Sequence, residues 1–222
     1  GSIAHATMLG RCGIIKEEEA DDIVKGLKGI LADIENGTLH IDMEAEDIHT
    51  FIEGELTKRI GDNGKRLHTS RSRNDQVAVD IKLYLKKEVV NVKNLVVGLI
   101  KVIADKAEKY SETVMPGYTH LQRAQPITFG HHLLAYGEML LRDVSRLEDC
   151  LKRMDEMPLG SCALAGTTYP IDRTITAELL GFDRITNNSL DGVSDRDYCI
   201  EFASVLSIIM VHLSRFSEEI IM

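Results

Sequence analysis

The chain has 222 residues and a formal net charge of -9 at pH 7, with 44% hydrophobic and 27% charged residues. These proportions are typical of a soluble globular protein with one domain, or one large domain and a small appendage. The acidic balance argues against broad nucleic-acid binding, which depends on cationic side chains that neutralise phosphates. The sequence shows no signal-peptide pattern and no uninterrupted apolar run long enough to span a membrane. The four cysteines form no C-x-x-C pair and fit free thiols in a reducing cytosol, so we expect a cytoplasmic protein.

The first 74 residues predict a small helical region. Apolar periodicity and stop signals indicate helices over residues 3–9, 16–36 and 44–60. A glycine-punctuated basic segment follows from Gly61 to Asn74. A solvated charged loop explains this segment as readily as a binding site does.

Three long helical patterns dominate residues 75–222, over 75–110, 126–154 and 194–222. Pro126 stands at the favoured first position of the second helix, and Ser194 to Asp197 resembles a capping box before the third. About 35 residues of helix span roughly 50 Å, so such helices need long partners. A short helix is expected over 175–180, and no convincing strand is visible. The predicted fold class is therefore all-α: a long-helix bundle, residues 75–222, behind the helical region of residues 1–74.

The long helices are apolar around much of their circumference. The segment Val89 to Ile100 places apolar side chains on more than one face. Three helices from one chain cannot bury that much apolar surface. We expect the surplus to meet other copies of the chain.

Two polar loops each precede a long helix. The first, residues 69–75, offers two guanidinium groups that bind carboxylates through paired N–H bonds, with neutral donors beside them: Arg71, Ser72, Arg73 and Asn74. The second, residues 115–126, carries a hydroxyl, an imidazole and an amide: Thr119, His120 and Gln122. An imidazole transfers protons near neutral pH. A polar connection between helices is the alternative for either loop, but together they indicate a small-anion site.

Several other sites are excluded by spacing. The sequence has no H-E-x-x-H, no G-x-x-x-x-G-K-[ST] and no G-x-S-x-G motif. His131 and His132 are adjacent on a predicted helix and point about 100° apart, which is poor geometry for one metal ion. The residues therefore predict no metal site. Without the family resemblance, their spacing predicts only a helical protein with a small-anion site.

Three segments together resemble the argininosuccinate lyase family of the fumarase/aspartase superfamily, which includes δ-crystallin: residues 69–77, 117–126 and 188–197. The histidine segment alone indicates the superfamily, and Arg71-Ser-Arg-Asn-Asp-Gln76 narrows it to this family. The resemblance covers essentially the whole chain.

The resemblance implies a homotetramer in which motifs from three subunits meet in each active site. It implies cofactor-free β-elimination of argininosuccinate to arginine and fumarate, a step of arginine biosynthesis. By motif position, His120 is the catalytic histidine, and Thr119 and Asn74 contact substrate. Arg73 and Ser72 are expected near the carboxylates. Gln122, Asp47 and His49 are weaker candidates for the same site.

Two departures from the family pattern matter. The family usually has glycine where Ser70 stands, so this turn differs if it requires a positive φ. The family's flexible serine loop, and the carboxylate that pairs with the histidine, do not occur in these residues. An N-terminal segment that touches substrate in the family is also absent. We therefore expect this chain to be a lyase scaffold truncated at both ends and inactive by itself.

Two alternatives stay open. Another fumarate-releasing lyase, such as adenylosuccinate lyase, would share the histidine segment. A non-enzymatic, δ-crystallin-like structural protein would keep every motif without activity. The substrate that yields fumarate distinguishes the two lyases. Substrate binding distinguishes an enzyme from the structural protein.

Overall fold

A computed structural model describes residues 1–222, and contacts within the chain group them into two compact units. The first unit contains residues 1–83 and 155–195, and the second contains residues 84–154 and 196–222. One helix, α4 (Arg73–Lys109), begins in the first unit and continues into the second. The predicted all-α fold class is confirmed. The predicted division at residue 74 stays a prediction.

The first unit is built from short helices around an aliphatic core. Its helices are α1 (Ser2–Arg11), α2 (Glu17–Glu35), α3 (Ile48–Ile60), the 3-10 helix η1 (Gly61–His68), α6 (Arg173–Leu180) and α7 (Ser189–Ser194). Two-residue parallel strands, β3 (Glu156–Met157) and β4 (Arg184–Ile185), complete it. A buried cluster joins α1, α2, α3 and η1 through Met8, Leu9, Ile23, Ile30, Leu56 and Leu67. Ile23, Ile30 and Leu56 are among the apolar positions that repeat with helical spacing in the sequence. Leu67 lies in the segment expected to be a loop.

Helix α3 begins later than predicted, at Ile48 instead of Glu44. The reason is Asp47, whose carboxylate accepts a hydrogen bond from the Thr50 backbone N–H at 2.6 Å. This contact makes Asp47 the N-cap of α3, so the residues before it form a non-helical connection. The basic segment after α3 is also more ordered than expected, because residues 61–68 form η1.

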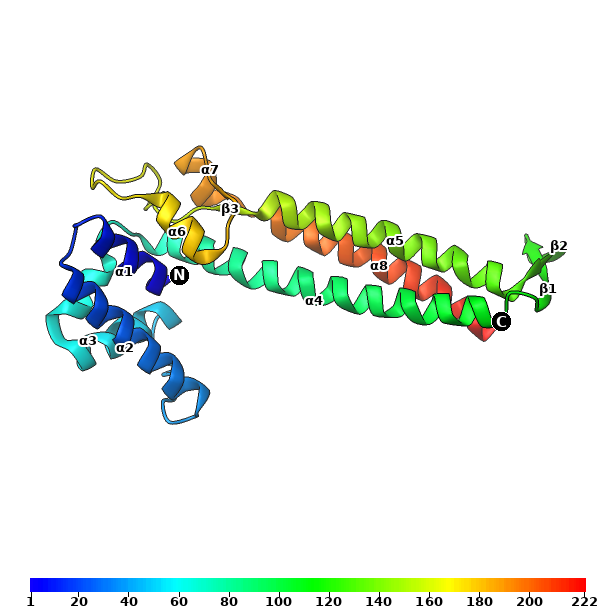
Figure 1. The fold of residues 1–222 in the computed structure, drawn as a ribbon, viewed down its shortest axis with the longest axis horizontal. Coiled ribbons are helices and arrows are strands. Elements are labelled where there is room, and N and C mark those ends of the chain that lie inside the picture. Colours follow the sequence, from blue (N-terminus) through cyan, green and yellow to red (C-terminus); the bar gives the residue numbers. More distant parts are fainter. The chain divides into compact units, whose positions relative to one another are not determined.

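The second unit is a bundle of long helices, in which α4, α5 (Phe129–Met154) and α8 (Asp197–Ile221) run side by side (Figure 1). Buried residues recur every seven positions, as Val89, Val96 and Ile103 on α4 and as Leu133, Leu140, Leu147 and Met154 on α5. A seven-residue repeat is the spacing of helices that pack along a continuous seam. The predicted long-helix bundle is confirmed.

The prediction of no convincing strand was wrong. Residues Val114–Thr119 and Gln122–Thr128 form an antiparallel hairpin, β1 and β2, between α4 and α5. Pro116 pairs with Pro126 across the hairpin, so Pro126 lies in a strand and α5 begins at Phe129. The two prolines hid the strands, because they donate no ladder hydrogen bonds and read as helix punctuation.

The predicted capping box at Ser194 was also wrong. Ser194 is the last residue of α7, and its hydroxyl donates to the Leu190 carbonyl at 2.7 Å. Helix α8 begins three residues later, at Asp197, without a side-chain cap.

Apolar side chains remain exposed along the bundle. Leu95 is 74% exposed on α4, and Met210 and Val211 are 61% and 66% exposed on α8. Helix α8 is long and apolar enough to cross a membrane by length and composition alone, and 17% of its most apolar window is buried. A core helix of a bundle passes the same test, so one such helix is weak support for a membrane span. The exposed face therefore predicts a covering partner.

Gly130, near the start of α5, packs tightly against the backbone at the end of α4. A Cβ at this position would lie 2.4 Å from the Ala107 carbonyl oxygen. We expect Gly130→Ala to lower the free energy of unfolding by about 1–3 kcal/mol, because the backbones must separate. Gly54→Ala, where no atom lies within 4 Å of the new Cβ, is the control and should raise it by about 0.5–1 kcal/mol. Urea unfolding of both variants checks this, and an unchanged Gly130→Ala midpoint would contradict it.

Candidate functional site

Residues Ser72 to Asp75 form the capping box at the start of α4. The Ser72 hydroxyl accepts from the Asn74 N–H at 3.3 Å, and the Asp75 carboxylate accepts from the Ser72 N–H at 2.9 Å. This reciprocal pair satisfies two backbone donors at the helix start. The motif that carries the family resemblance is thus partly a helix-initiation signal.

Asp75 also joins two loops of the first unit. Its second carboxylate oxygen accepts from the Gly160 and Cys162 backbone N–H groups at 2.9 and 2.8 Å. Asp75 is fully buried, and a buried carboxylate needs several donors of this kind. The basic segment is therefore fixed against the glycine-rich loop of residues 159–166.

Arg71 is a buried structural arginine. Its side chain has no exposed area, and its guanidinium donates to the Ser2 hydroxyl at 2.9 Å and to the Glu53 carboxylate at 3.2 Å. Burial lowers the pKa of Arg71, and the nearby Glu53 opposes that shift. In this conformation Arg71 presents no guanidinium nitrogen to solvent.

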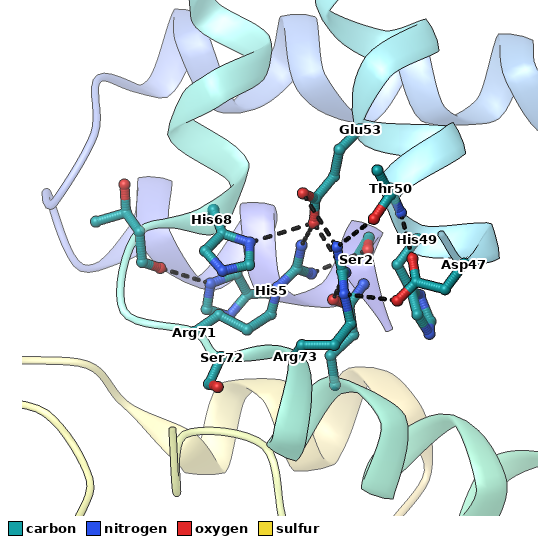
Figure 2. Close-up of polar contacts among 12 residues, drawn as sticks. Ser2, His5, Asp47, His49, Thr50, Glu53, His68, Arg71, Ser72 and Arg73 are labelled. Atoms are coloured by element: carbon teal, nitrogen blue, oxygen red, sulfur yellow. Dashed lines mark hydrogen bonds and ion pairs between the residues drawn. The ribbon is translucent and has the colours of Figure 1, made fainter. Parts of the chain in front are cut away.

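The Arg73 guanidinium is surrounded by acceptors of the protein itself (Figure 2). Its Nε lies 3.0 Å from the Asp47 carboxylate. Its two terminal nitrogens donate to Glu53, to the Gln76 amide oxygen and to the Thr50 hydroxyl. All three nitrogens are therefore engaged, and the neutral Asn74 is the exposed residue of the motif.

Glu53 is the residue that sequence reasoning missed. One carboxylate oxygen, Oε1, lies 3.2 Å from nitrogens of three side chains, His68, Arg71 and Arg73. Burial by itself would raise the pKa of Glu53, but the hydrogen bonds from Arg73 and His68 outweigh it, and the pKa is lowered. The only sequence signal is its place one helical turn after His49 on the predicted helix.

Asp47 and His49 flank the start of α3 on the same side of the cluster (Figure 2). The hydrogen bond from the Thr50 N–H lowers the pKa of Asp47, and Arg73 adds to this. His49 Nδ1 lies 3.6 Å from the Asp80 carboxylate. Burial lowers the pKa of His49 and raises that of Asp80, so burial opposes the charged form of both groups. The structure therefore brings both weaker candidates to Arg73.

In the second unit, His120 lies at the tip of the β1–β2 hairpin. His120 and Leu121 are the two turn residues, and both have positive φ, 51° and 60°. This two-residue turn normally takes Asn-Gly, because residues with a Cβ are disfavoured at positive φ. Thr119 and Gln122 are the paired residues on either side, and all three predicted side chains are exposed. Backbone strain of this kind clusters at functional sites.

A groove of about 850 Å³ lies beside this hairpin. Its polar lining includes His120 and Thr119 from the hairpin, His132 from α5, and Arg215 and Glu219 from α8. The Tyr136 ring of this groove packs against two other rings. Its centroid lies 4.6 Å from that of Phe216 and 5.8 Å from that of His132. His120 therefore lines a groove with both polar and aromatic side chains of the same unit.

The predicted site residues divide between the two units. Ser72, Arg73 and Asn74 belong to the first unit, with Asp47 and His49, while Thr119, His120 and Gln122 belong to the second. No group of three or more His, Cys, Asp or Glu side chains is arranged to hold a metal ion. Each unit therefore carries one part of the predicted substrate site.

A family model described as "Lyase" matches residues 1–222, the whole chain. The chain belongs to this lyase family. The resemblance predicted from its motifs is confirmed by relatives named argininosuccinate lyase. Those from Desulforamulus reducens and Heliobacterium mobile are 61% and 62% identical over 222 residues.

This lyase chain covers 48% of each of these relatives, so it spans about half their length. A crystal structure of EDDS lyase in complex with formate has the same fold, with a TM-score of 0.89 and 34% identity. That match covers 99% of this chain and 43% of the EDDS lyase chain.

Ser70 occupies a turn that favours glycine. Its φ is 56°, and its buried hydroxyl has no hydrogen-bond partner. The departure at this position therefore carries strain, and we expect Ser70→Gly to raise the free energy of unfolding by about 1 kcal/mol. Cys162→Gly, also at positive φ, should gain less, because the Cys162 thiol donates to the Ser70 carbonyl at 3.3 Å. Urea unfolding tests both, and a Ser70→Gly variant no more stable than the parent would contradict the strain.

His5 predicts a pH dependence of stability. Burial lowers the pKa of His5 to about 3, and Nε2 is held 2.8 Å from the Thr69 carbonyl. Below about pH 6.5, His5 is protonated in the unfolded chain but stays neutral in the folded chain. The free energy of unfolding therefore falls as the pH drops below about 6.5. The slope from this group approaches about 1.4 kcal/mol per pH unit. Urea unfolding between about pH 4.5 and 7.5 measures it.

His5→Gln should remove this part of the slope. Replacement of the exposed His40 by Gln is the control and should leave the slope unchanged. A His5→Gln protein with the parent slope would show that His5 is not the group responsible.

Proposed function

We propose that this chain supplies the histidine and amide motifs of an argininosuccinate lyase, an enzyme that cleaves argininosuccinate to arginine and fumarate in the cytoplasm. The observation that carries the proposal is the joint presence of the capped Ser72–Asp75 motif and the strained His120 turn in one chain. The names of the relatives at about 60% identity support the choice of substrate.

The reaction breaks one C–N bond and one C–H bond. A base removes a proton from the carbon next to a carboxylate, the carbanion is held as a dianion, and the guanidinium nitrogen leaves with a proton. His120 transfers a proton in this scheme, because its exposed imidazole stands at the tip of the hairpin. Thr119 and Gln122 beside it are hydrogen-bonding partners for the substrate.

Asn74 is the second substrate contact. It is the exposed residue of its motif, and its amide also donates to the Ala163 carbonyl at 3.1 Å. Three neutral groups at this loop can contact a substrate carboxylate: the other Nδ2 proton of Asn74, its amide oxygen and the Ser72 hydroxyl. Arg73 lies beside them with its charge paired to Glu53 and Asp47. Donors held in place before the reaction stabilise a developing dianion more than mobile donors do.

We infer that the complete site draws on several copies of the chain in a homotetramer. The two motifs belong to different units of the chain, and neither unit holds both. The exposed apolar residues of α4 and α8 offer a face for other copies of the same helices. A bundle of copies covers this face without a membrane.

A spectrophotometric assay for fumarate tests the proposal. Protein expressed from the complete gene is added to argininosuccinate, with adenylosuccinate in a parallel cuvette. Fumarate from argininosuccinate alone is the expected result. Fumarate from adenylosuccinate alone would assign the other lyase. Silence in both, together with calorimetric binding of neither substrate, would favour a structural role without activity.

His120→Asn should lower kcat by about 10²- to 10⁴-fold, the usual contribution of a positioned proton-transfer group. His131→Asn is the matched control, because His131 is exposed on α5 and does not line the groove. Steady-state kinetics on argininosuccinate measures both. A His120→Asn enzyme with the parent kcat would remove His120 from the mechanism.

A further inference from the structure

The geometry points to Glu53 as the positioning residue of the Asn74 loop. This inference rests on the proposed function, because it concerns how the substrate-binding loop keeps its shape. Glu53 lies on α3, outside every motif that carries the family resemblance. Its role follows from what its carboxylate contacts.

Glu53 joins the two arginines of the motif from one side. Arg71 and Arg73 are two residues apart, and both reach Glu53 Oε1 at 3.2 Å. Ser72, between them, points away from the carboxylate (Figure 2). Because Ser72 lies between the two arginines in the chain, a contact that holds both arginines also restricts the backbone that carries Ser72.

The orientation of Ser72 matters for Asn74. The Ser72 hydroxyl caps α4 by accepting from the Asn74 N–H, which fixes where the exposed Asn74 side chain begins. A Ser72 rotated to the other face would lose this cap. Glu53 therefore acts on Asn74 through Arg71, Arg73 and Ser72.

Glu53 is the only carboxylate that contacts both arginines. Arg73 has a second anionic partner in Asp47, whereas the buried Arg71 has its ion pair with Glu53. An uncharged residue at position 53 leaves the Arg71 guanidinium buried without that partner. The loop would then rearrange to bring the Arg71 charge to another acceptor or to water.

Glu53→Gln, in protein expressed from the complete gene, tests this role. We expect KM for argininosuccinate to rise about 10- to 100-fold, because a displacement of about 1 Å is enough for such a loss. The value of kcat should change much less, since His120 is untouched. Glu55→Gln is the matched control on the same helix, where the carboxylate pairs with Lys58 at 2.6 Å. Its KM should equal that of the parent.

A spectroscopic readout separates this inference from the proposed function. Charge-assisted contacts slow the rotation of an arginine side chain, so Arg71 and Arg73 should give resolved guanidinium signals in ¹⁵N-resolved NMR spectra. Glu53→Gln should broaden both sets of signals, whether or not argininosuccinate is the substrate. If the parent protein releases no fumarate but Glu53→Gln still broadens the arginine signals, the proposed function alone is contradicted.

The double variant Glu53→Gln/Arg71→Gln guards against simple unfolding, because it removes the buried charge that the single variant leaves unpaired. The double variant should fold, have a kcat close to that of the parent protein and keep the raised KM. A folded single or double variant with the parent KM and the parent Arg73 signals would overturn the inference. An equal rise of KM in Glu55→Gln would overturn it as well.

Discussion

The contact between the Glu53 carboxylate and two arginines is the constraint on which the first unit depends. A guanidinium with no exposed side-chain area is unfavourable unless a carboxylate lies beside it, and for Arg71 that carboxylate is Glu53. The same oxygen holds Arg73, and Asp47 holds Arg73 from the other side while it caps α3. One carboxylate thus links a helix start, a basic segment and the beginning of α4.

The basic segment is consequently a scaffold more than a patch of positive charge. Its arginines are neutralised by Glu53 and Asp47, its serine and aspartate form a capping box, and its asparagine is left exposed. A carboxylate that approaches this loop meets a neutral amide on a rigid support. The hairpin around His120 follows the opposite design, since an exposed imidazole sits on a strained two-residue turn. Ion pairs and hydrogen bonds shape the first loop, and a turn with two positive φ angles shapes the second.

Sequence reasoning predicted the helices well, because their apolar positions repeat with helical spacing and their buried faces follow that repeat. The hairpin was missed because Pro116 and Pro126 hide its strands, and pairing across a turn leaves no periodic signal in so short a segment. The motifs located Asn74 and His120 but not Glu53. Its contacts come from residues 15 to 20 positions later in the chain, and a lone glutamate on an amphipathic helix reads as surface charge.

We propose that the Asn74 loop and the His120 hairpin serve one active site through different copies of the chain. Fumarate release by a mixed assembly tests it most directly. An Asn74→Ala variant and a His120→Asn variant, each expected to be strongly impaired alone, would be co-expressed so that their subunits mix. The account predicts that the mixture regains activity, because some sites then receive an intact loop from one subunit and an intact hairpin from another. A mixture as inactive as either variant would contradict it.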